Sequence, residues 1–588
     1  MSCLRREGEL VEVSVEVDAR LEAAEIHRRV IAAGGPALLF TNVRGSELPL
    51  ATNLFGTARR AELAFGKRPF QLIRRLVGLA ETLLPPTPRA LWEARGTGRD
   101  LLRIGLRKRR SGPVTEVVEH DVRLDRLPVL TTWSEDGGPF VTLPLVYTEH
   151  PAGKGHNLGM YRLQVHGPRT TGMHWQIGKG GGFHYAEAEA SGDALPATVF
   201  LGGPPALILA AIAPLPENVP ELMLASLLAG GKLEVCEGPG PHRLLAEAEI
   251  ALIGKVPPAV RRPEGPFGDH YGYYSLEHDY PVFEVDAIAR RRDAIYPATV
   301  VGKPRQEDFY IGDLLQDLLS PLFPLVMPGV IDLWSYGETG YHSLSAAVVR
   351  ERYRREAMAS AFRILGEGQL SLTKFLLVTD RQVDLRDFRA TLEHILARTR
   401  TETDLFVLSN VSMDTLDYTG PRVNEGSKGI WMGLGDPIRE LPREFRATEL
   451  PSGVAEVHVF CAGCLVLGLE AGLDGEALSR VAAHPAFASW PLLVVSDEPR
   501  RAAASPMNFL WTTFTRFEPA ADLYAVEREV VRHHLAYRGP ILLDARVRPG
   551  FPDELHCDPE TAARVDRRWR EYFPGGVEMG DAERGHLD

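Results

Sequence analysis

Residues 264–289 read EGPFGDHYGYYSLEHDYPVFEVDAIA, and this stretch decides the fold of the central part of the chain. A turn-forming Gly-Pro-Phe-Gly segment leads into residues 281–289, which are rich in β-branched and aromatic residues and predict a strand. Four more strands are predicted at 115–122, 140–147, 160–165 and 247–254, separated by Gly/Pro clusters at 136–139, 151–155, 178–182 and 238–241. Many strands with glycine-rich turns predict a β-barrel-like domain at 114–305 with one or two added helices.

The flanks of this domain mix helical and strand patterns. In residues 1–113, helical spacing and a short apolar strand predict an N-terminal α/β domain, with helices at 21–33, 58–65 and 70–84 and the strand at 37–41. A linker at 306–329 precedes a C-terminal α/β domain at 330–588 with a polar, helical tail. There the pattern predicts strands at 375–378, 404–408, 491–495 and 541–544 and helical spacing at 342–364, 385–397 and 521–536. We find no internal repeat. The predicted fold class is α/β, in the wide sense of a multidomain α+β chain.

The composition excludes several classes of protein. At 588 residues, 44% hydrophobic and 24% charged, the chain is long enough for about three or four domains and too apolar for disorder. Acidic residues outnumber basic ones by 78 to 66, which disfavours nucleic acid as a partner. No apolar run reaches the roughly 18–20 residues of an integral membrane segment, and no signal-peptide pattern is found. Five cysteines make no disulfide framework, so we expect a reducing, cytoplasmic setting.

Two acids and an arginine are the first candidates for chemistry. Glu264 and Asp269 flank a Pro-Phe-Gly turn, and Arg162 follows the glycine-rich segment at 151–159. Two acids near an arginine can position a substrate acid and relay a proton, because burial raises the pKa of one acid while the arginine lowers that of its partner. The alternative is a solvated acidic loop. The aromatic residues at 267, 271, 273 and 274 make full exposure of this loop less favourable, so both interpretations stay open.

Two further patterns have a structural and a functional interpretation. The glycines at 180–182 follow Lys179 and can form either a hairpin turn or a phosphate-binding nest of N–H groups. Glu221 lies three residues after Asn218, the predicted N-cap of a helix that ends at the glycines 230–231. It can therefore be the glutamate of a capping box, or an oxygen ligand of a hard cation together with Asn157.

Cys461 and Cys464 form a C-x-x-C pair, a spacing found in redox pairs and in halves of zinc sites. No second C-x-x-C follows, and the pair lies within an apolar, strand-like run. Buried, inert thiols are the favoured interpretation.

Taken together, these strings resemble one known family. In order, they are NLGMYR at 157–162, MHWQ and GKGGG within 173–182, APLPE at 213–217 with PELMLASLLAGG at 220–231, EGPFGDHYGYY at 264–274 and PVFEV at 281–285. This series is similar to that of the UbiD family, reversible (de)carboxylases of aromatic and α,β-unsaturated acids that use prenylated flavin mononucleotide (FMN). The resemblance runs from about residue 35 to 560; RQED at 305–308 and TKFLLVTD at 373–380 also look like family segments.

The resemblance assigns roles residue by residue. It implies that Arg162, Glu264 and Asp269 form the catalytic network, in which Arg162 holds the substrate carboxylate, Asp269 donates a proton and Glu264 holds Arg162. It implies that Asn157 and Glu221 bind a divalent metal, usually manganese, and it leaves room for a potassium ion. The implied flavin contacts are Met160, Tyr161, Arg162, His174, Trp175, Gln176, Lys179 and Gly180, with Lys374 as a less secure match.

One departure concerns the metal. Many family members have a histidine where this chain has Gly178. Either His184 or water is expected to complete the metal shell, or the metal is expected to bind more weakly. The resemblance also implies an architecture, namely an N-terminal α/β domain, a central flavin-binding split β-barrel and a C-terminal α/β oligomerisation domain. Implied partners are a small aromatic or unsaturated acid, a flavin prenyltransferase that supplies the cofactor, and further copies of the chain in a homodimer or homohexamer.

Three functions stay open at this point. The first is a carboxy-lyase, with the larger family members pointing to quinone biosynthesis or to aromatic degradation. The second is a protein that binds flavin or phosphate without decarboxylating anything; the set Arg162, Glu264 and Asp269 argues against it, because simple binding does not need all three residues. The third, a metal-dependent hydrolase, has no pair of histidines at metal-ligand spacing to support it. The sequence fixes neither the substrate nor the physiological direction.

Overall fold

The computed structural model describes residues 1–82, 87, 96, 103–175, 180–213, 220–303, 305–446 and 449–581. The chain forms two compact units. Unit 1 combines Met1–Leu318 with Asp553–His586, and unit 2 is formed mainly by Leu319–Pro552. The predicted boundaries after residues 113 and 305 both lie inside unit 1, and the predicted linker at 306–329 contains the helices α10 (Glu307–Leu319) and α11 (Phe323–Val326). The scheme of domains stays a prediction.

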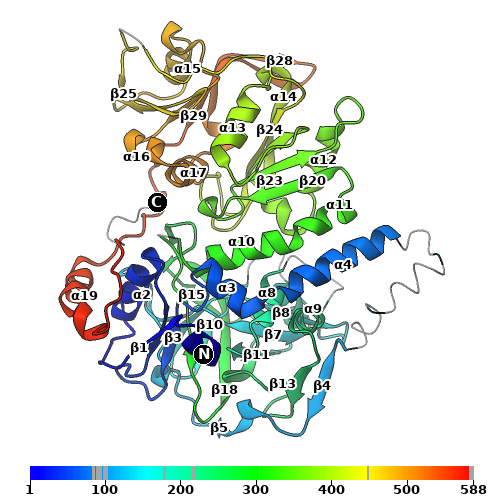
Figure 1. The fold of residues 1–588 in the computed structure, drawn as a ribbon, viewed down its shortest axis with the longest axis vertical. Helices are drawn as coiled ribbons and strands as arrows, with labels where there is room; N and C mark the ends of the chain where they lie inside the picture. Colours follow the sequence, from blue (N-terminus) through cyan, green and yellow to red (C-terminus); the bar gives the residue numbers. More distant parts are fainter. Residues whose placement is uncertain are drawn as a thin grey trace. The chain divides into compact units, whose positions relative to one another are not determined.

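A ten-stranded antiparallel sheet forms the middle of unit 1 (Figure 1). Its main path runs β6-β9-β10-β18-β14-β11-β7-β8, and β15 and β5 also pair with β18. The long strand β18 (His278–Arg290) thus joins most of the sheet, as its run of apolar residues predicted. The other strands are β5 Val117–Glu119, β6 Phe140–Val141, β7 Leu145–Glu149, β8 His156–Gly159, β9 Leu163–Gly167, β10 Thr170–Gly172, β11 Leu195–Leu201, β14 Ile250–Val256 and β15 Arg261–Glu264.

Three helices accompany this sheet, where one or two were expected. They are α7 (Gly180–Ala190), α8 (Ala206–Ile212) and α9 (Glu221–Ala229). The glycines 180–182 therefore begin a helix, so the interpretation of this segment as a hairpin turn was wrong. Small additional strands are β4 Leu106–Arg109, β12 Leu233–Cys236 and β13 Leu244–Leu245 in one sheet and β16 Phe267–Gly268 with β17 Tyr274–Ser275 in another.

The first 82 residues form a small α/β layer on unit 1. Strands β1 (Leu10–Val13), β2 (Ala37–Phe40), β3 (Leu50–Thr52) and β19 (Tyr296–Pro297) make a four-stranded sheet. The helices are α1 Ser2–Arg6, α2 Glu22–Ala32, α3 Ala58–Phe65 and α4 Arg68–Thr82. The helices predicted from apolar spacing at 21–33 and 58–65 are confirmed, and so is the strand at 37–41.

The tail of the chain returns to unit 1. Helix α19 (Pro559–Tyr572) packs against α2, where Glu22 accepts hydrogen bonds from Arg568 and from the hydroxyl of Tyr572, each at 2.6 Å. The apolar side of α19, including Val565 and Tyr572, joins the main core of unit 1. The predicted polar, helical tail is thus a helix that docks on the N-terminal α/β layer.

Unit 2 contains two five-stranded sheets with the same strand order. The first runs β20-β21-β22-β24-β23 and the second β25-β26-β27-β29-β28. In each, the first pair is antiparallel, the next two pairs are parallel and the last pair is antiparallel. The strands are β20 Val330–Ser335, β21 Leu344–Val349, β22 Phe375–Thr379, β23 Leu405–Ser412, β24 Glu425–Gly433, β25 Val454–Cys461, β26 Cys464–Leu469, β27 Leu492–Val495, β28 Leu523–Val531 and β29 His534–Asp544.

The helices of unit 2 follow the same repeat. In the first half, α12 (Glu356–Leu365) follows the second strand, and α13 (Phe388–Leu396) and α14 (Thr401–Asp404) follow the third. In the second half, α15 (Glu476–Ala482) follows the second strand, and α16 (Pro499–Ala504), α17 (Pro506–Phe514) and α18 (Pro519–Asp522) follow the third. The expectation that the chain has no internal repeat was therefore wrong. The repeat lies in topology, and few residue identities survive to show it in the sequence.

Of the helical stretch predicted at 342–364, the second part is confirmed as α12 and the first part was wrong; the helix predicted at 521–536 was also wrong. Residues 344–349 form strand β21, whose six residues are all buried, and a short continuous apolar run cannot be told from a buried helix by spacing. Residues 523–531 form strand β28, which pairs with β29 in a hairpin. No helix in the described parts of the chain combines the length and apolar character needed to span a bilayer.

Candidate active site

The side chain of Arg162 lies between two carboxylates of unit 1. Arg162 is in the loop from β8 to β9, Glu264 ends β15 and Asp269 follows β16. Nε of Arg162 donates to Oε1 of Glu264 at 3.1 Å, and Nη1 forms an ion pair with Oδ2 of Asp269. Nη2 donates to Oγ of Ser275 at 3.1 Å. The structure therefore brings together the three residues that the sequence singled out for catalysis.

Both acids are buried and both are ionised in this arrangement. Burial opposes ionisation of Asp269, but the charge of Arg162 and the hydrogen bonds from His270 hold its pKa well below the ordinary value. Burial likewise opposes ionisation of Glu264, and His174 together with Arg162 lowers its pKa. We expected a raised pKa for one acid. That expectation fails because a single guanidinium bonds to both carboxylates.

Two histidines complete the network. Nδ1 of His174 lies 2.7 Å from Oε1 of Glu264, and Nδ1 of His270 lies 2.6 Å from Oδ1 of Asp269. Burial and the charge of Arg162 lower the pKa of His174, which is therefore neutral near pH 7. The sequence prediction included His174 only as a flavin contact and missed His270, although His270 is adjacent to Asp269 in the GDHYG string.

Asp308 is a further acid that the sequence prediction missed. It is the second residue of α10, and neither of its carboxylate oxygens has a hydrogen-bond partner among the described residues. Burial raises its pKa to about 7; the nearby His270 acts against that rise and Asp269 adds to it. Near neutral pH, Asp308 is thus the acid of this neighbourhood that retains a proton. In the sequence, only its place in the family-like RQED segment at 305–308 could have indicated a role for Asp308.

Buried polar atoms without partners mark where a ligand fits. Within the described residues, Oε2 of Glu264, Nε2 of His174 and Nε1 of Trp175 have no hydrogen-bond partner. A Cβ on Gly172 would lie 2.6 Å from Oε2 of Glu264, and one on Gly181 would lie 2.5 Å from Nε1 of Trp175. Unpaired buried polar atoms are costly, so a polar ligand that bonds to them is favoured. These residues therefore fit a flavin-sized polar group.

The two predicted metal ligands lie next to each other. Asn157 is in β8, and Oε2 of Glu221 accepts the backbone N–H of its neighbour Leu158 at 3.2 Å. Burial raises the pKa of Glu221, which favours a positive charge beside it. A Cβ on Gly180 would overlap Oδ1 of Asn157, so the start of α7 approaches this amide as only glycine allows. Carboxylate and amide oxygens suit a hard divalent cation.

His184 lies beside this pair. It is one turn after Gly180 on the same face of α7, and its Nδ1 is 2.9 Å from Oγ1 of Thr148. Thr148 is paired with Asn157 across β7 and β8. Burial lowers the pKa of His184 to about 4, so its imidazole is neutral. No group of three or more His, Cys, Asp and Glu side chains at metal-binding distance occurs within the described residues.

The structure does not support the capping-box interpretation of Glu221. Helix α9 begins at Glu221, after Pro220 in an extended conformation, so Glu221 is the first helical residue and not the third. Its carboxylate bonds to β8 instead. The predicted end of this helix is confirmed, since Gly230 caps it in the left-handed conformation.

Of the remaining predicted site residues, some are described by the structure and some are not. Asn218, Gln176, Gly178 and Lys179 are outside the described residues. Tyr161 is buried, and its hydroxyl accepts a hydrogen bond from Nδ2 of Asn157 at 3.4 Å; Met160 is partly buried beside it.

Lys374 belongs to unit 2. It is fully buried, and its ammonium lies 2.8 Å from Oδ2 of Asp417. The contact between Lys374 and a flavin stays a prediction.

The C-x-x-C pair lies at the buried hairpin between β25 and β26. Cys461 ends β25 and Cys464 begins β26, and both thiols are buried and free. Burial raises the pKa of Cys464 well above its ordinary value, which suppresses the reactive thiolate. This agrees with the interpretation of inert thiols.

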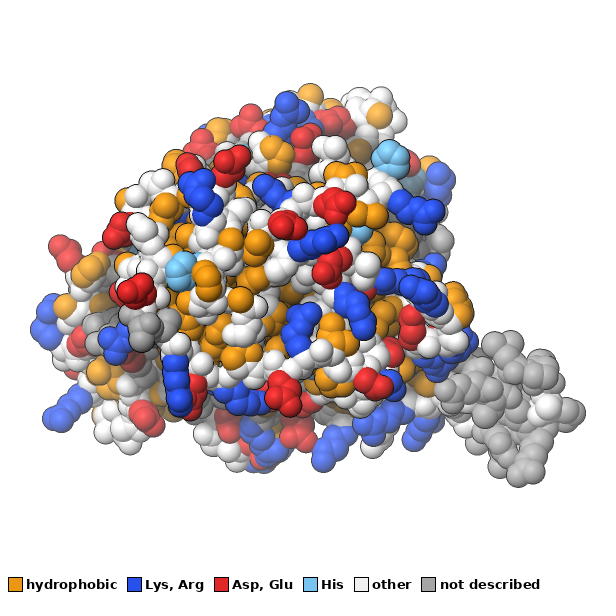
Figure 2. Space-filling view, turned by 90° about the horizontal axis from the view of Figure 1, so that it is seen from above, with side chains coloured by type: hydrophobic (Ala, Val, Ile, Leu, Met, Phe, Trp, Pro, Cys, Tyr) orange, Lys and Arg blue, Asp and Glu red, His pale blue; other side chains and the backbone are white. Residues whose placement is uncertain are grey.

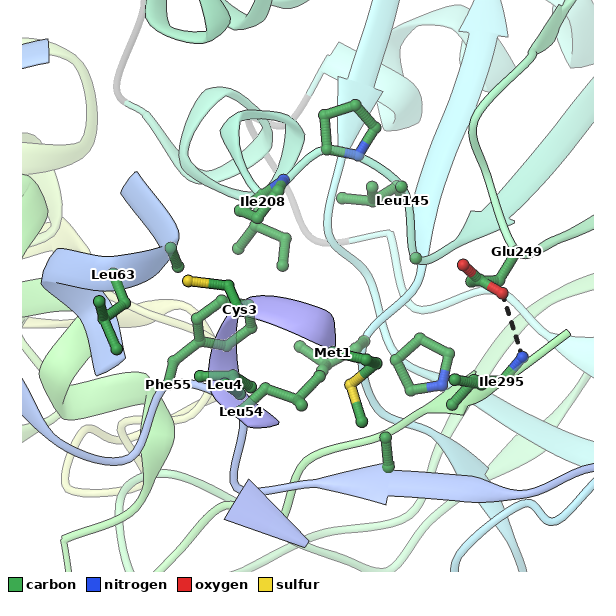
Figure 3. A pocket seen from close by; sticks show the side chains of 18 residues that line it. Met1, Cys3, Leu4, Leu54, Phe55, Leu63, Leu145, Ile208, Glu249 and Ile295 are labelled. Carbon is green, nitrogen blue, oxygen red and sulfur yellow. Dashed lines mark hydrogen bonds between the residues drawn. The ribbon is translucent and has the colours of Figure 1, made fainter. Parts of the chain in front are cut away.

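A separate pocket of about 310 Å³ lies elsewhere in unit 1 (Figure 3). Its walls are mostly apolar and come from α1, β3, α3 and α8, with the carboxylate of Glu249 at one side. Glu249 accepts the N–H of Ile295 at 3.1 Å, the contact that is drawn in Figure 3. None of Arg162, Glu264 and Asp269 lines this pocket, so it is distinct from the candidate active site.

Models of three domains of one family match the chain. They are described as the N-terminal, Rift-related and C-terminal domains of 3-octaprenyl-4-hydroxybenzoate carboxy-lyase, and they match residues 1–80, 106–304 and 309–433. An uncharacterized protein of Chlamydia trachomatis is 50% identical over 97% of this chain and 98% of its own length. A Chlamydia pneumoniae protein, named as one of the subunits of a 4-hydroxybenzoate decarboxylase, is 51% identical over 98% of each chain.

The solved structures that share this fold include a named decarboxylase and a UbiD-class enzyme. Vanillic acid decarboxylase of Sedimentibacter hydroxybenzoicus, in closed form, has a TM-score of 0.66 at 23% identity and covers 77% of this chain and 94% of its own. The UbiD-class enzyme HmfF of Pelotomaculum thermopropionicum, in complex with FMN, has a TM-score of 0.61 at 25% identity, covering 76% and 96%. An evolved dimeric form of HmfF was solved with prenylated FMN, at 23% identity and a TM-score of 0.60, covering 76% and 96%. The predicted mixed α/β fold is thereby confirmed.

Proposed function

This chain belongs to the UbiD family, and on that premise we propose that it is a carboxy-lyase that removes carbon dioxide, reversibly and without net oxidation, from an aromatic or α,β-unsaturated acid with the help of prenylated FMN. The HmfF structures with FMN and prenylated FMN support the choice of cofactor. The substrate class that we favour is a hydroxybenzoate-like acid. The family description and the name of the Chlamydia pneumoniae relative support this choice. A place in quinone biosynthesis rests on the family resemblance alone.

One observation carries the proposal: a buried arginine is held by two buried carboxylates beside polar atoms that have no partner. A protein that only binds a flavin needs donors for the phosphate and ring, and it gains nothing from two ionised acids on one guanidinium. Burying such charges carries a desolvation cost, and buried charge networks of this kind are found preferentially at functional sites. The arrangement therefore favours catalysis on an anionic substrate over simple flavin binding.

When bound, prenylated FMN supplies the electron sink that accepts the electron pair left behind by carbon dioxide. The residues of this chain have the remaining tasks. Arg162 presents Nη groups that can bind the substrate carboxylate through two parallel hydrogen bonds. Glu264, fixed by His174, holds Arg162 in place through Nε. The apolar ring of Phe267 lies 4.7 Å from the guanidinium carbon and shields the ion pairs from water.

Proton delivery falls to Asp269. In the free protein it is a carboxylate because Arg162 bonds to it. A substrate carboxylate on Arg162 shares that positive charge, so the pKa of Asp269 rises and it can take up the proton that it must donate. His270 bonds to Asp269, and Asp308 carries the proton near pH 7. We propose that Asp308 and His270 resupply Asp269, as positioning and relay residues.

The metal site holds the cofactor phosphate. Asn157 and Glu221 would provide two oxygen ligands of a divalent metal, and His184 would provide a nitrogen ligand in place of the histidine that is absent at Gly178. A manganese ion held there would offset the negative charge of the cofactor phosphate, and a potassium ion is a further candidate cation for the same phosphate. A flavin prenyltransferase would supply the cofactor.

A panel assay tests this function. The protein is co-expressed with a prenylating flavin transferase and incubated with hydroxybenzoates, cinnamates and furoates, and carbon dioxide release is measured with the product. We expect turnover of at least one hydroxybenzoate and none after Arg162→Lys, which keeps the charge but loses the planar pair of donors. A flavin-loaded protein without turnover of any acid would favour flavin binding alone.

A further inference from the structure

The two halves of unit 2 repeat each other down to single hydrogen bonds. Asp404 ends α14 and accepts the N–H of Arg400 at 2.9 Å, and Asp522 ends α18 and accepts the N–H of Glu518 at 2.7 Å. Each aspartate also pairs with an arginine. The sequences before them, TRTETDL at 399–405 and TRFEPAADL at 515–523, keep T-R-x-E and D-L in the same order. We call residues 330–433 the first copy and residues 454–544 the second copy.

The copies pack through equivalent faces. On each sheet one face is covered by that copy's own helix, α12 or α15. The other face, with α13 or α17, enters one core that both copies share. Phe388 of α13 lies 5.8 Å from Phe509 of α17 and 6.1 Å from Phe460 of β25, between ring centroids. Equivalent elements of the two copies thus contact each other, as in a two-fold symmetric dimer, but within one chain.

Buried charge distinguishes the copies. In the first copy the carbonyl of Lys374 accepts the N–H of Gly429, and in the second the carbonyl of Pro491 accepts the N–H of Ile541. Lys374 therefore corresponds to Pro491, and by the same register Lys428 corresponds to Pro540. The second copy has kept the packing face and lacks both buried lysines.

The family model for the C-terminal domain ends at residue 433, the end of the first copy. The second copy lies beyond the residues that this model matches.

We propose that the second copy takes the place of a second chain: it covers in cis the face of the first copy that would otherwise bind another copy of this protein. The inner face of β21, β22 and β24 with α13 is thus a self-association surface that is already filled. Any assembly of this chain, including the dimers or hexamers that the family resemblance implies, uses other surfaces. This inference does not depend on the proposed catalytic function.

Hydrogen–deuterium exchange of the full chain tests the proposal directly. Exchange is compared at about 1 and 50 µM, and sedimentation gives the mass at each concentration. We expect slow, concentration-independent exchange in β21, β22, β24 and α13, whatever the mass. Faster exchange in these elements when an assembly dissociates on dilution would show that another chain covers the face. Fast exchange in a monomer would show that the second copy does not cover it, and either result would contradict the proposal.

A matched pair of variants tests the link between the copies. Phe388→Ala opens a cavity in the shared core, and Ile364→Ala opens one under α12 on the outer face of the first copy. We expect Phe388→Ala to speed exchange in both β22 and β27, and Ile364→Ala to speed it in the first copy only. Equal patterns for the two variants would contradict the shared, self-filled interface. Neither measurement uses cofactor or substrate, so its failure is distinct from a failure of the proposed function.

Discussion

At the scale of single residues, the account depends on how the guanidinium of Arg162 is shared between two carboxylates. An arginine stays protonated at all relevant pH values, so its partners respond to it and not the reverse. Glu264 and Asp269 both bond to it, and each has a further histidine partner. A substrate carboxylate that joins this set changes the environment of Asp269 more than that of Glu264, because His174 keeps its bond to Glu264.

The first prediction concerns the proton donor. Asp269→Asn should keep the flavin and lose decarboxylation by about 10²–10⁴-fold, because it keeps the shape and removes the titratable group. Incorporation of solvent deuterium into the product measures the proton step, and the bound-flavin spectrum controls for occupancy. If Asp269→Asn exchanges at the wild-type rate while Glu264→Gln does not, the two roles are reversed. The pH profile of either variant reports the coupled set.

The second prediction concerns Asp308. Its pKa is raised to about 7, so the folded protein binds this proton more tightly than the unfolded chain does. Its contribution to stability is therefore full below pH 4 and falls as the pH rises to 7. Asp308→Asn should raise the melting temperature relative to wild type increasingly between pH 4 and 7, with a constant difference above. The same change at the exposed Asp193 controls for the loss of one carboxylate, and a pH-independent difference for Asp308→Asn would refute the raised pKa.

At the scale of elements, the start of α7 and the start of α9 meet at β8. Gly180 approaches the amide of Asn157, Glu221 bonds to the backbone of Leu158, and His184 lies over the strand pair. Two helix starts directed at one strand also place N–H groups where an anionic phosphate gains from the helix dipole.

The third prediction is that Gly180→Ala abolishes metal-dependent retention of the cofactor. The new methyl group must displace Asn157, although alanine itself favours the helix. Metal content after dialysis and bound flavin report the effect. Gly231→Ala is the control, because a Cβ there meets nothing within 4 Å. Normal metal content in Gly180→Ala would remove Asn157 from the metal shell.

The fourth prediction is that Glu221→Ala weakens flavin retention more than it weakens folding. As the first residue of α9 it contributes through its bond to Leu158 and through the helix dipole, together about 1 kcal/mol. As a metal ligand its loss should release the cofactor. A lower melting temperature with unchanged cofactor content would identify a purely structural role.

Local patterns predicted much of the fold and only part of the site. Helices with clear spacing, such as α3, and strands with long apolar runs, such as β18, followed from the sequence. Residues 521–536 did not, because β28 is exposed over its second half and takes its conformation from pairing with β29. Asp308 has no local signature of catalysis, since its raised pKa arises from burial near residues almost forty positions away.

At the scale of the whole molecule, unit 1 carries the candidate active site, and unit 2 contains two sheets with the same strand order. Acidic and basic side chains are interspersed over the face shown in Figure 2. The internal repeat was not predicted from the sequence, because its sequence traces are short while strand order and register persist after most side chains have changed. The shared core of the two copies and the aspartates 404 and 522 reveal it in the structure.

The most direct test of the central claim is a comparison of turnover with two cofactors. The apoprotein is loaded with manganese and either prenylated or ordinary FMN, and decarboxylation of the best acid from the panel is measured under identical conditions. The account predicts turnover with prenylated FMN and none above background with ordinary FMN. Full turnover with ordinary FMN would contradict it.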